Sequence, residues 1–208
     1  SLVYKYYKEL PDISTLIEDY SPSIPTTVYD RKGRVIDVIS REKRETAKFR
    51  EIPQNLKNAF LAIEDKQFYS HHGIHYKRLL GAVVANVKSG AAVQGASSFT
   101  QQLARNAFLS HEKSIARKIK EALITFEIER KYTKDEIFEK YLNEIYFGAG
   151  AYGVKTAAEQ FYKKDISQIN LAEAALLAGI PNRPETYNPS KKLNNSLKRM
   201  RLILSEMY

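Results

Sequence analysis

From Pro53 to the end of the chain one pattern recurs, in which stretches with helical periodicity are interrupted by glycine or proline. The first stretch places Leu56, Phe60, Ile63 and Gln67 along a single stripe, and Pro53 suits a helix start. A stripe of this period does not fit a strand, so the pattern restricts the chain to a mainly α-helical fold. Further helices are expected near residues 76–87, 99–108, 113–131, 134–143, 151–162, 170–179 and 192–207.

The N-terminal part of the chain differs from this helical part. Residues 26–29 and 35–39 flank the turn sequence 30–33, and together they predict a β-hairpin, the one confident strand pair. Residues 9–25 contain three prolines and are expected to form an extended linker. The small, polar stretch 88–98 carries glycine and predicts a mobile loop between helices.

The composition restricts the partners more than the fold. A formal net charge of +9 over 208 residues indicates an anionic partner, whether nucleic acid, a phospholipid surface or a phosphorylated substrate. The lack of cysteine excludes disulfides and thiolate metal sites, and four histidines make a zinc site unpromising. No apolar run approaches the roughly 20 residues that span a bilayer.

Both chain ends suggest a piece of a longer protein. The sequence has no initiator methionine and stops within the helical pattern of residues 193–207. Residues 2–8 combine tyrosine and lysine, which fits either the interfacial belt beside a membrane helix or the start of a tyrosine-rich soluble helix. These residues alone do not choose between the two.

Glu64 is the first candidate for chemistry. On a helix, Phe60 and Phe68 lie four positions either side of it and Leu61 three positions before it, whereas Asp65 turns away. Apolar surroundings raise the pKa of a carboxylate, which suits a general acid or base near neutral pH. The alternative is an ordinary solvated glutamate, and Asp65 is expected to pair with a nearby histidine or arginine or to support Glu64.

The expected helix over residues 113–131 carries a second candidate group. Its core stripe is predicted to be Ile115, Ile119, Ala122, Leu123 and Phe126. Glu121 lies on the other side, where isoleucines indicate that this face is covered as well. Arg117, Lys118 and Glu121 then face a cleft or another lobe. The alternative is a surface salt bridge between Arg117 and Glu121, worth about 0.3–0.5 kcal/mol.

Hydroxyl and amide side chains follow the predicted loop directly, at Ser97, Ser98, Thr100, Gln101 and Gln102. Ser97 or Ser98 makes a fair helix N-cap. Hydroxyl and amide groups are also what a sugar-binding cleft uses. The chain contains no P-loop, no Rossmann glycine pattern and no Gly-x-Ser-x-Gly.

Five ordered segments within residues 64–189 carry a family resemblance. They are Glu64-Asp65-Lys66-Gln67-Phe68-Tyr69-Ser70-His71-His72-Gly73, the stretch from Gly95 to Asn106, Arg117-Lys118-Ile119-Lys120-Glu121, the stretch from Lys134 to Gly153, and the stretch from Leu171 to Pro181. Together they resemble the peptidoglycan glycosyltransferases of family 51, the polymerase module of class A bifunctional penicillin-binding proteins. Ser98, Arg105 and Phe138 depart mildly, since the family usually has Thr, Lys and Leu there.

The resemblance implies a lysozyme-like helical large lobe and a smaller membrane-proximal lobe with a hydrophobic surface. Residues 1–50 are then a linker and hairpin that follow a membrane anchor, and residues 51–208 are the catalytic domain. The implied substrate is lipid II, polymerised on the outer face of the bacterial cytoplasmic membrane. Implied partners are the growing lipid-linked glycan chain, the membrane surface, moenomycin-type inhibitors and a downstream transpeptidase domain, without nucleic acid. Lipid pyrophosphates and anionic headgroups would explain the positive charge.

The same resemblance implies an inverting mechanism that forms a β-1,4 link. Glu64 is the general base for the 4-hydroxyl of lipid II, and Arg117 and Lys118 stabilise the leaving pyrophosphate. Glu121, the second catalytic residue, orients these cations or the donor sugar, or holds a divalent cation (Mg or Mn), the one cofactor left open. Further substrate contacts are expected from Asp65, Phe68, His71, Ser97, Ser98, Thr100, Gln101, Gln102 and Asn106.

Two other functions stay open at this point. A lysozyme-like hydrolase also needs one glutamate in an apolar helical setting, but Arg117 and Lys118 have no role in cleaving a neutral glycosidic bond. A basic module that only docks on an anionic membrane or nucleic acid would bind in a salt-sensitive way and would not depend on Glu64.

Overall fold

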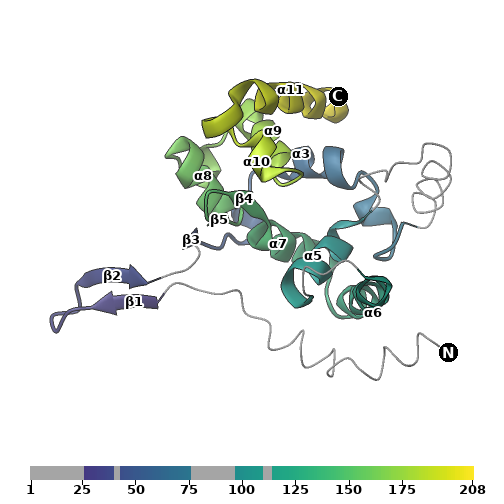
Figure 1. The fold of residues 1–208 in the computed structure, drawn as a ribbon, viewed down its shortest axis with the longest axis horizontal. Coiled ribbons are helices and arrows are strands. Elements are labelled where there is room, and N and C mark those ends of the chain that lie inside the picture. The colour runs from purple at the N-terminus through teal and green to yellow at the C-terminus, as the bar shows by residue number, and fades with distance from the viewer. Residues whose placement is uncertain (1–25, 40–42, 76–96, 110–113) are drawn as a thin grey trace. The chain divides into compact units, whose positions relative to one another are not determined.

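The computed structural model describes residues 26–39, 43–75, 97–109 and 114–208 (Figure 1). The chain divides into two compact units. The first comprises Ser1–Tyr20 and Glu64–Tyr141, and the second comprises Ser21–Ile63 and Leu142–Tyr208. Both are mainly helical where they are described, which confirms the predicted fold class. The predicted helix 76–87, most of the loop 88–98 and the linker 9–25 lie outside the described residues.

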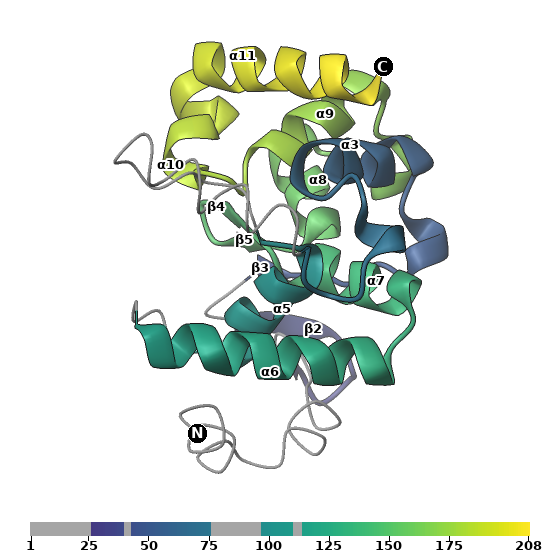
Figure 2. The same ribbon diagram turned by 90° about the vertical axis from the view of Figure 1, so that its right-hand side faces the viewer.

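The described elements of the first unit are four. They are the 3-10 helix η2 (Phe68–Ser70), α5 (Phe99–Phe108), α6 (Ile115–Lys131) and α7 (Lys134–Glu144), whose last residues continue into the second unit. α5 and α6 lie side by side (Figure 2). Ser98 caps α5 as predicted, because its Oγ accepts from the Gln101 N–H at 3.1 Å while the Gln101 side chain accepts from the Ser98 N–H at 3.1 Å.

Four aromatic rings form the core of the first unit. The centroid of the Phe99 ring lies 5.1 Å from Phe68, 4.8 Å from Phe138 and 4.4 Å from Tyr141, and all four side chains are fully buried. These residues come from η2, α5 and α7. Aromatic packing therefore joins three elements that are distant in sequence.

The first helix is shorter than predicted. α3 (Gln54–Glu64) begins after Pro53, whose carbonyl accepts the first helical hydrogen bonds, but it ends at Glu64 and does not reach Gln67. The chain turns there, and the N–H of Phe68 donates to the Asp65 carbonyl at 3.1 Å. Burial of the Phe68 ring in the aromatic core stabilises this turn, a tertiary contact that helical periodicity does not register.

The prediction of the core stripe of α6 was wrong. The buried residues of α6 are Glu121, Ile124, Thr125 and Ile128. Two members of the predicted stripe, Ile115 and Phe126, are 78% and 43% exposed. The buried face is the one that Gly73 approaches, because a Cβ on Gly73 would lie 2.7 Å from the Thr125 Cγ2. Periodicity finds both apolar stripes but does not decide which of them packs.

The second unit contains most of the described elements. Its helices are α3, η1 (Phe49–Glu51), α8 (Val154–Tyr162), η3 (Ile166–Gln168), α9 (Leu171–Gly179), α10 (Pro184–Tyr187) and α11 (Pro189–Met207). α9 and α11 pack side by side (Figures 1 and 2). Gly179 permits this, since a Cβ there would lie 2.8 Å from the Arg199 Cγ. No helix in the described ranges has the length and apolarity of a membrane span.

The predicted hairpin is confirmed, and a small second sheet was not foreseen. β1 (Thr26–Tyr29) pairs with β2 (Val35–Ile39) in antiparallel fashion. The second sheet has the order β3-β5-β4, where β3 is Lys43–Arg44, β4 is Tyr146–Gly148 and β5 is Ala151–Tyr152. The helix predicted from residue 151 accordingly begins at Val154, after Gly153 with its φ of +81°.

Asn143 connects the end of α7 to the segment after β3. Its side chain is buried, accepts from the Ala47 N–H at 2.9 Å and donates to the Ala47 carbonyl at 2.9 Å. The Asn143 side-chain amide thus forms the pair of hydrogen bonds that a neighbouring strand would form, and it satisfies both the N–H and the carbonyl of the buried Ala47.

Replacing Asn143 with alanine should lower the free energy of unfolding by about 2 to 4 kcal/mol, because each buried polar group left without a partner costs about 1 to 3 kcal/mol. Chemical denaturation measures the change. Asn58 is the matched control. It is exposed and accepts from the Gln54 side chain on the same helix, so Asn58→Ala should cost no more than about 0.5 kcal/mol. Equal losses in the two variants would contradict this role of Asn143.

Candidate active site

Glu64 is the last residue of α3 and is half-buried. The Gln102 side-chain amide, on the first turn of α5, donates to the Glu64 Oε2 at 3.1 Å. The same amide lies 3.5 Å from the Ser97 carbonyl. A carboxylate whose orientation is set by a neighbouring amide is suited to act on one defined hydroxyl.

Asp65 follows Glu64 in the chain, and 1% of its side chain is exposed. Its Oδ2 accepts from the His71 Nε2 at 2.8 Å and lies 3.4 Å from the backbone N–H of Phe99. The predicted pairing of Asp65 with a histidine is therefore confirmed. This carboxylate joins the turn after α3 to the first residue of α5.

The pKa of Tyr141 is affected by the charges around Glu64. Burial raises the pKa of the Tyr141 phenol well above its usual range, and the negative charges of Glu64 and Asp65 raise it further, while Arg105 lowers it. Tyr141 belongs to α7, and Arg105 lies on α5 one turn after Gln102. The fully buried Tyr141 phenol therefore lies close enough to Glu64, Asp65 and Arg105 to sense their charges.

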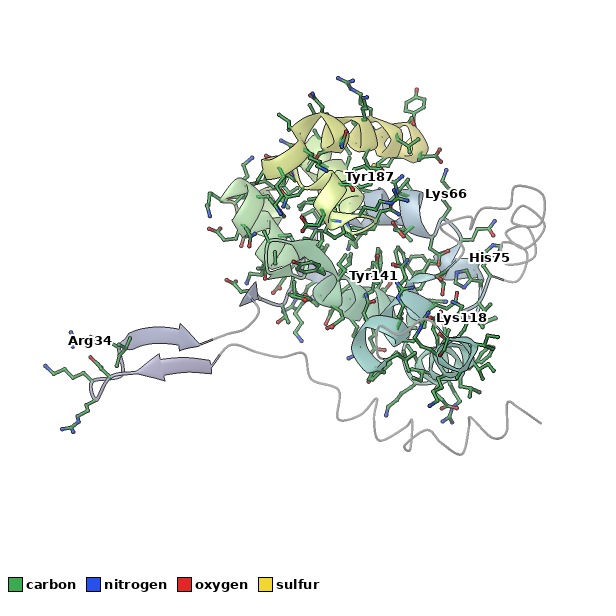
Figure 3. All side chains as sticks on the ribbon, in the orientation of Figure 1. Arg34, Lys66, His75, Lys118, Tyr141 and Tyr187 are labelled. Atoms are coloured by element: carbon green, nitrogen blue, oxygen red, sulfur yellow. The ribbon has the colours of Figure 1, made fainter. Side chains whose placement is uncertain are left out.

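A second group of charges lies at the N-terminal half of α6. The fully buried Glu121 carboxylate accepts from the Arg117 Nη1 at 3.0 Å and from the Lys118 ammonium. The Lys118 side chain, labelled in Figure 3, is 47% exposed. The predicted pairing of Arg117 with Glu121 is confirmed, but the pair is buried on the acid side and is not a surface salt bridge.

The other predicted site residues divide into three groups. Ser98, Thr100 and Gln101 are buried, and their polar groups make hydrogen bonds within the chain. Phe68 is part of the aromatic core. Ser97 is half-buried and Asn106 is exposed. Direct contact of these residues with a substrate stays a prediction.

The structure adds one charged pair that the sequence analysis did not select. The Glu129 carboxylate lies 2.7 Å from the Lys134 ammonium and accepts from the Thr100 hydroxyl. A signal was present, because Glu129 lies eight residues after Glu121 and therefore on the same face of α6. In the sequence, the stretch around Glu129 looks like a run of solvent-exposed charges. The packing of α5 against this face of α6 shows that Glu129 is nearly buried.

The described residues around Glu121 do not suit a metal ion. A Mg or Mn site needs several oxygen ligands, and no group of three or more acidic, histidine or cysteine side chains occurs within the described ranges. The Glu121 carboxylate also has two cations beside it. A divalent cation held by Glu121 stays a prediction.

Comparison with known protein families identifies the family of this chain. The sequence model described as "Transglycosylase" matches residues 32–208. The chain belongs to the transglycosylase family. This match confirms the resemblance inferred from the five motifs. The chain is therefore a glycosyltransferase.

The chain is similar to parts of longer known proteins. The chain is 44% identical over 201 residues to "Penicillin-binding protein 1A" of Aquifex aeolicus, covering 97% of this chain and 28% of that protein. It is 45% identical over 197 residues to "Penicillin-binding protein 1A/1B" of Bacillus subtilis, covering 94% and 21%. A crystal structure of penicillin-binding protein 1A from Haemophilus influenzae is 24% identical, with a TM-score of 0.49, covering 91% and 18%. The chain spans less than a third of each.

Replacing Glu121 with glutamine should lower the free energy of unfolding by about 1 to 3 kcal/mol, because the buried charge shared by Arg117 and Lys118 is lost while one of the two cations stays partly solvated. Thermal and chemical denaturation measure the effect. Glu127→Gln is the control on the same helix, since Glu127 pairs with the exposed Arg130 and should matter by less than about 1 kcal/mol. A loss no larger than that of the control would show that the Glu121 cluster is dispensable for stability.

Proposed function

We propose that this transglycosylase chain polymerises lipid II into β-1,4-linked glycan strands with inversion at the anomeric carbon. The observation that carries the proposal is an oriented carboxylate, Glu64, in the same unit as the paired cations Arg117 and Lys118. Attack on a sugar that leaves with pyrophosphate needs both: a base for the attacking hydroxyl and positive charge for the departing anion.

Glu64 is proposed as the base that removes the proton from the 4-hydroxyl of the incoming lipid II. The Gln102 amide donates to its Oε2 at 3.1 Å and thereby sets the orientation of the carboxylate. The hydroxyl oxygen then forms the new bond to the anomeric carbon of the growing chain, and the bond from that carbon to the lipid pyrophosphate breaks. The proton stays on Glu64 until it passes to solvent.

Lys118 and Arg117 are proposed to receive the pyrophosphate. Lys118 is suited to this because its side chain is 47% exposed while its ammonium pairs with the buried Glu121 carboxylate. Arginine can engage two phosphate oxygens at once. Glu121 then acts as a positioning residue that keeps two like charges side by side before the anion arrives.

Glu64→Gln should reduce polymerisation of lipid II by at least about a thousandfold, since glutamine cannot take up the proton and general-base catalysis together with its electrostatic support is lost. Gel separation of labelled glycan products measures the rate, and binding of a non-reactive donor analogue should stay within about threefold. Omitting or adding a chelator in the same assay tests the open role of a divalent cation. Near-normal turnover by Glu64→Gln would refute the assignment of the base.

The rival activity is cleavage of glycan by a lysozyme-like hydrolase. Such an enzyme acts on a neutral glycosidic bond, and the cationic pair on α6 has no charge to stabilise there. The wild-type protein should therefore release no fragments from purified sacculi under conditions in which it polymerises lipid II. Release of fragments without polymerisation would favour the hydrolase.

We further propose that the protein works at the outer face of the cytoplasmic membrane, in a longer chain that also holds an N-terminal anchor and a downstream transpeptidase domain. The net charge of +9 suits anionic lipids. The outward face of α6 suits the bilayer interface, since it exposes Ile115 and Phe126 on a helix with five basic residues.

A double variant, Ile115→Asp with Phe126→Asp, should bind vesicles of phosphatidylglycerol at least about tenfold more weakly, because burial of each large apolar side chain contributes about 1.5 to 3 kcal/mol. Co-sedimentation with the vesicles measures the binding. Leu202→Asp on α11 is the control, because Leu202 is an exposed leucine of the second unit and should leave binding unchanged. Equal weakening by both would show that the α6 face has no special part in membrane contact.

A further inference from the structure

Glu129 is a nearly buried carboxylate for which the proposed reaction has no use. Its side chain is 8% exposed. It lies on the same face of α6 as Thr125, four residues earlier. Helices α5 and α6 lie side by side (Figure 2), and Glu129 contacts Thr100 of α5. A buried charge is costly unless it is paired, so its partners show what it is for.

The partners of Glu129 come from the starts of two other helices. The hydroxyl of Thr100, the second residue of α5, donates to the Glu129 Oε1. The ammonium of Lys134, the first residue of α7, lies 2.9 Å from Oε1 and 2.7 Å from Oε2, and 4.5 Å from the centroid of the Phe68 ring. One carboxylate thus holds α5, α6 and α7 together.

The stem of Glu129 also supports the turn that follows α3. A Cβ on Gly73 would lie 2.9 Å from the Glu129 Cγ, and the φ of Gly73 is +80°, so only glycine fits there without strain. The Ser98 hydroxyl donates to the Gly73 carbonyl. The turn and the start of α5 therefore both rest on α6 at Glu129.

Thr100 occupies the turn of α5 that also contacts the proposed base. The N–H of Phe99, one residue before it, lies 3.4 Å from Asp65, and the Gln102 amide, two residues after it, donates to Glu64 at 3.1 Å. The Thr100 side chain is fully buried. The first turn of α5 thus contacts Glu64 and Asp65 through Gln102 and Phe99. It contacts Glu129 through the Thr100 hydroxyl.

We propose that Thr100 is a positioning residue for catalysis and that Glu129 is its anchor. The hydrogen bond between them fixes the first turn of α5, and through Gln102 it fixes the orientation of the Glu64 carboxylate. This assigns Thr100 a role inside the protein in place of the predicted contact with substrate. The inference rests on the proposed function, in which Glu64 is the base.

Thr100→Val tests the inference, because valine has the shape of threonine without the hydroxyl. It should lower kcat for lipid II polymerisation at least about tenfold and leave KM within about twofold, since misplacement of a catalytic group by a fraction of an ångström slows the chemical step without weakening binding. Thr100→Ser keeps the hydroxyl and should retain kcat within about threefold.

The matched control is Thr125→Val. Thr125 is also a fully buried threonine of the first unit, but its hydroxyl donates to the Glu121 carbonyl one turn earlier in its own helix. Both valine variants lose one buried hydroxyl, so their melting temperatures should fall to a similar extent. Only Thr100→Val should lose kcat.

The link to Glu129 is tested by combining variants. If Thr100 acts through Glu129, adding Thr100→Val to Glu129→Ala should lower kcat no further, because the hydrogen bond is already lost. Multiplication of the two effects would overturn the proposed anchor. A rise in KM at constant kcat, an unchanged kcat in Thr100→Val, or an equal loss in Thr100→Ser would overturn the positioning role.

The wild-type rate separates this inference from the proposed function. A wild-type protein that does not polymerise lipid II contradicts the proposed function, and the inference falls with it. An active wild-type protein with an equally active Thr100→Val contradicts the inference alone.

Discussion

The arrangement of the site depends on one buried carboxylate, Asp65. A desolvated charge of this kind needs donors, and here the His71 ring and the N–H of Phe99 at the start of α5 both lie at Oδ2, while the buried Oδ1 has no hydrogen-bond partner among the described residues. Because Asp65 follows Glu64 directly, the two contacts that hold Asp65 Oδ2 also restrict where Glu64 projects. The aromatic core of Phe68, Phe99 and Tyr141 then excludes water from this junction.

One face of α6 has different functions along its length. Glu121 near the start of the helix gathers the cations Arg117 and Lys118, whereas Glu129, two turns later, anchors Thr100 and Lys134. Both acids are buried and both are paired with positive charge, yet only the first pair presents a half-exposed cation. The same physical rule, that a buried charge needs a partner, thus yields a candidate anion site in one place and a structural anchor in another.

Much of this site could be predicted from local patterns. The cap at Ser98, the start of α5 at Phe99 and the pairing of Asp65 with a histidine all depend on residues close in sequence, where spacing determines contact. The end of α3 at Glu64 and the buried face of α6 were predicted wrongly. Both depend on packing against distant residues, Phe68 on the aromatic core and Thr125 against Gly73, and no periodicity contains that information.

The sequence by itself determined the family, the helical class and the residues with chemical potential, because motifs and amphipathic periods are local properties of the chain. Only the tertiary structure decided which of those residues are available. It placed Thr100 inside, against Glu129, and left Lys118 partly in solvent beside the buried Glu121. The physical reason is that exposure belongs to the packed molecule: two apolar stripes on one helix are equivalent in sequence until a neighbouring helix covers one of them.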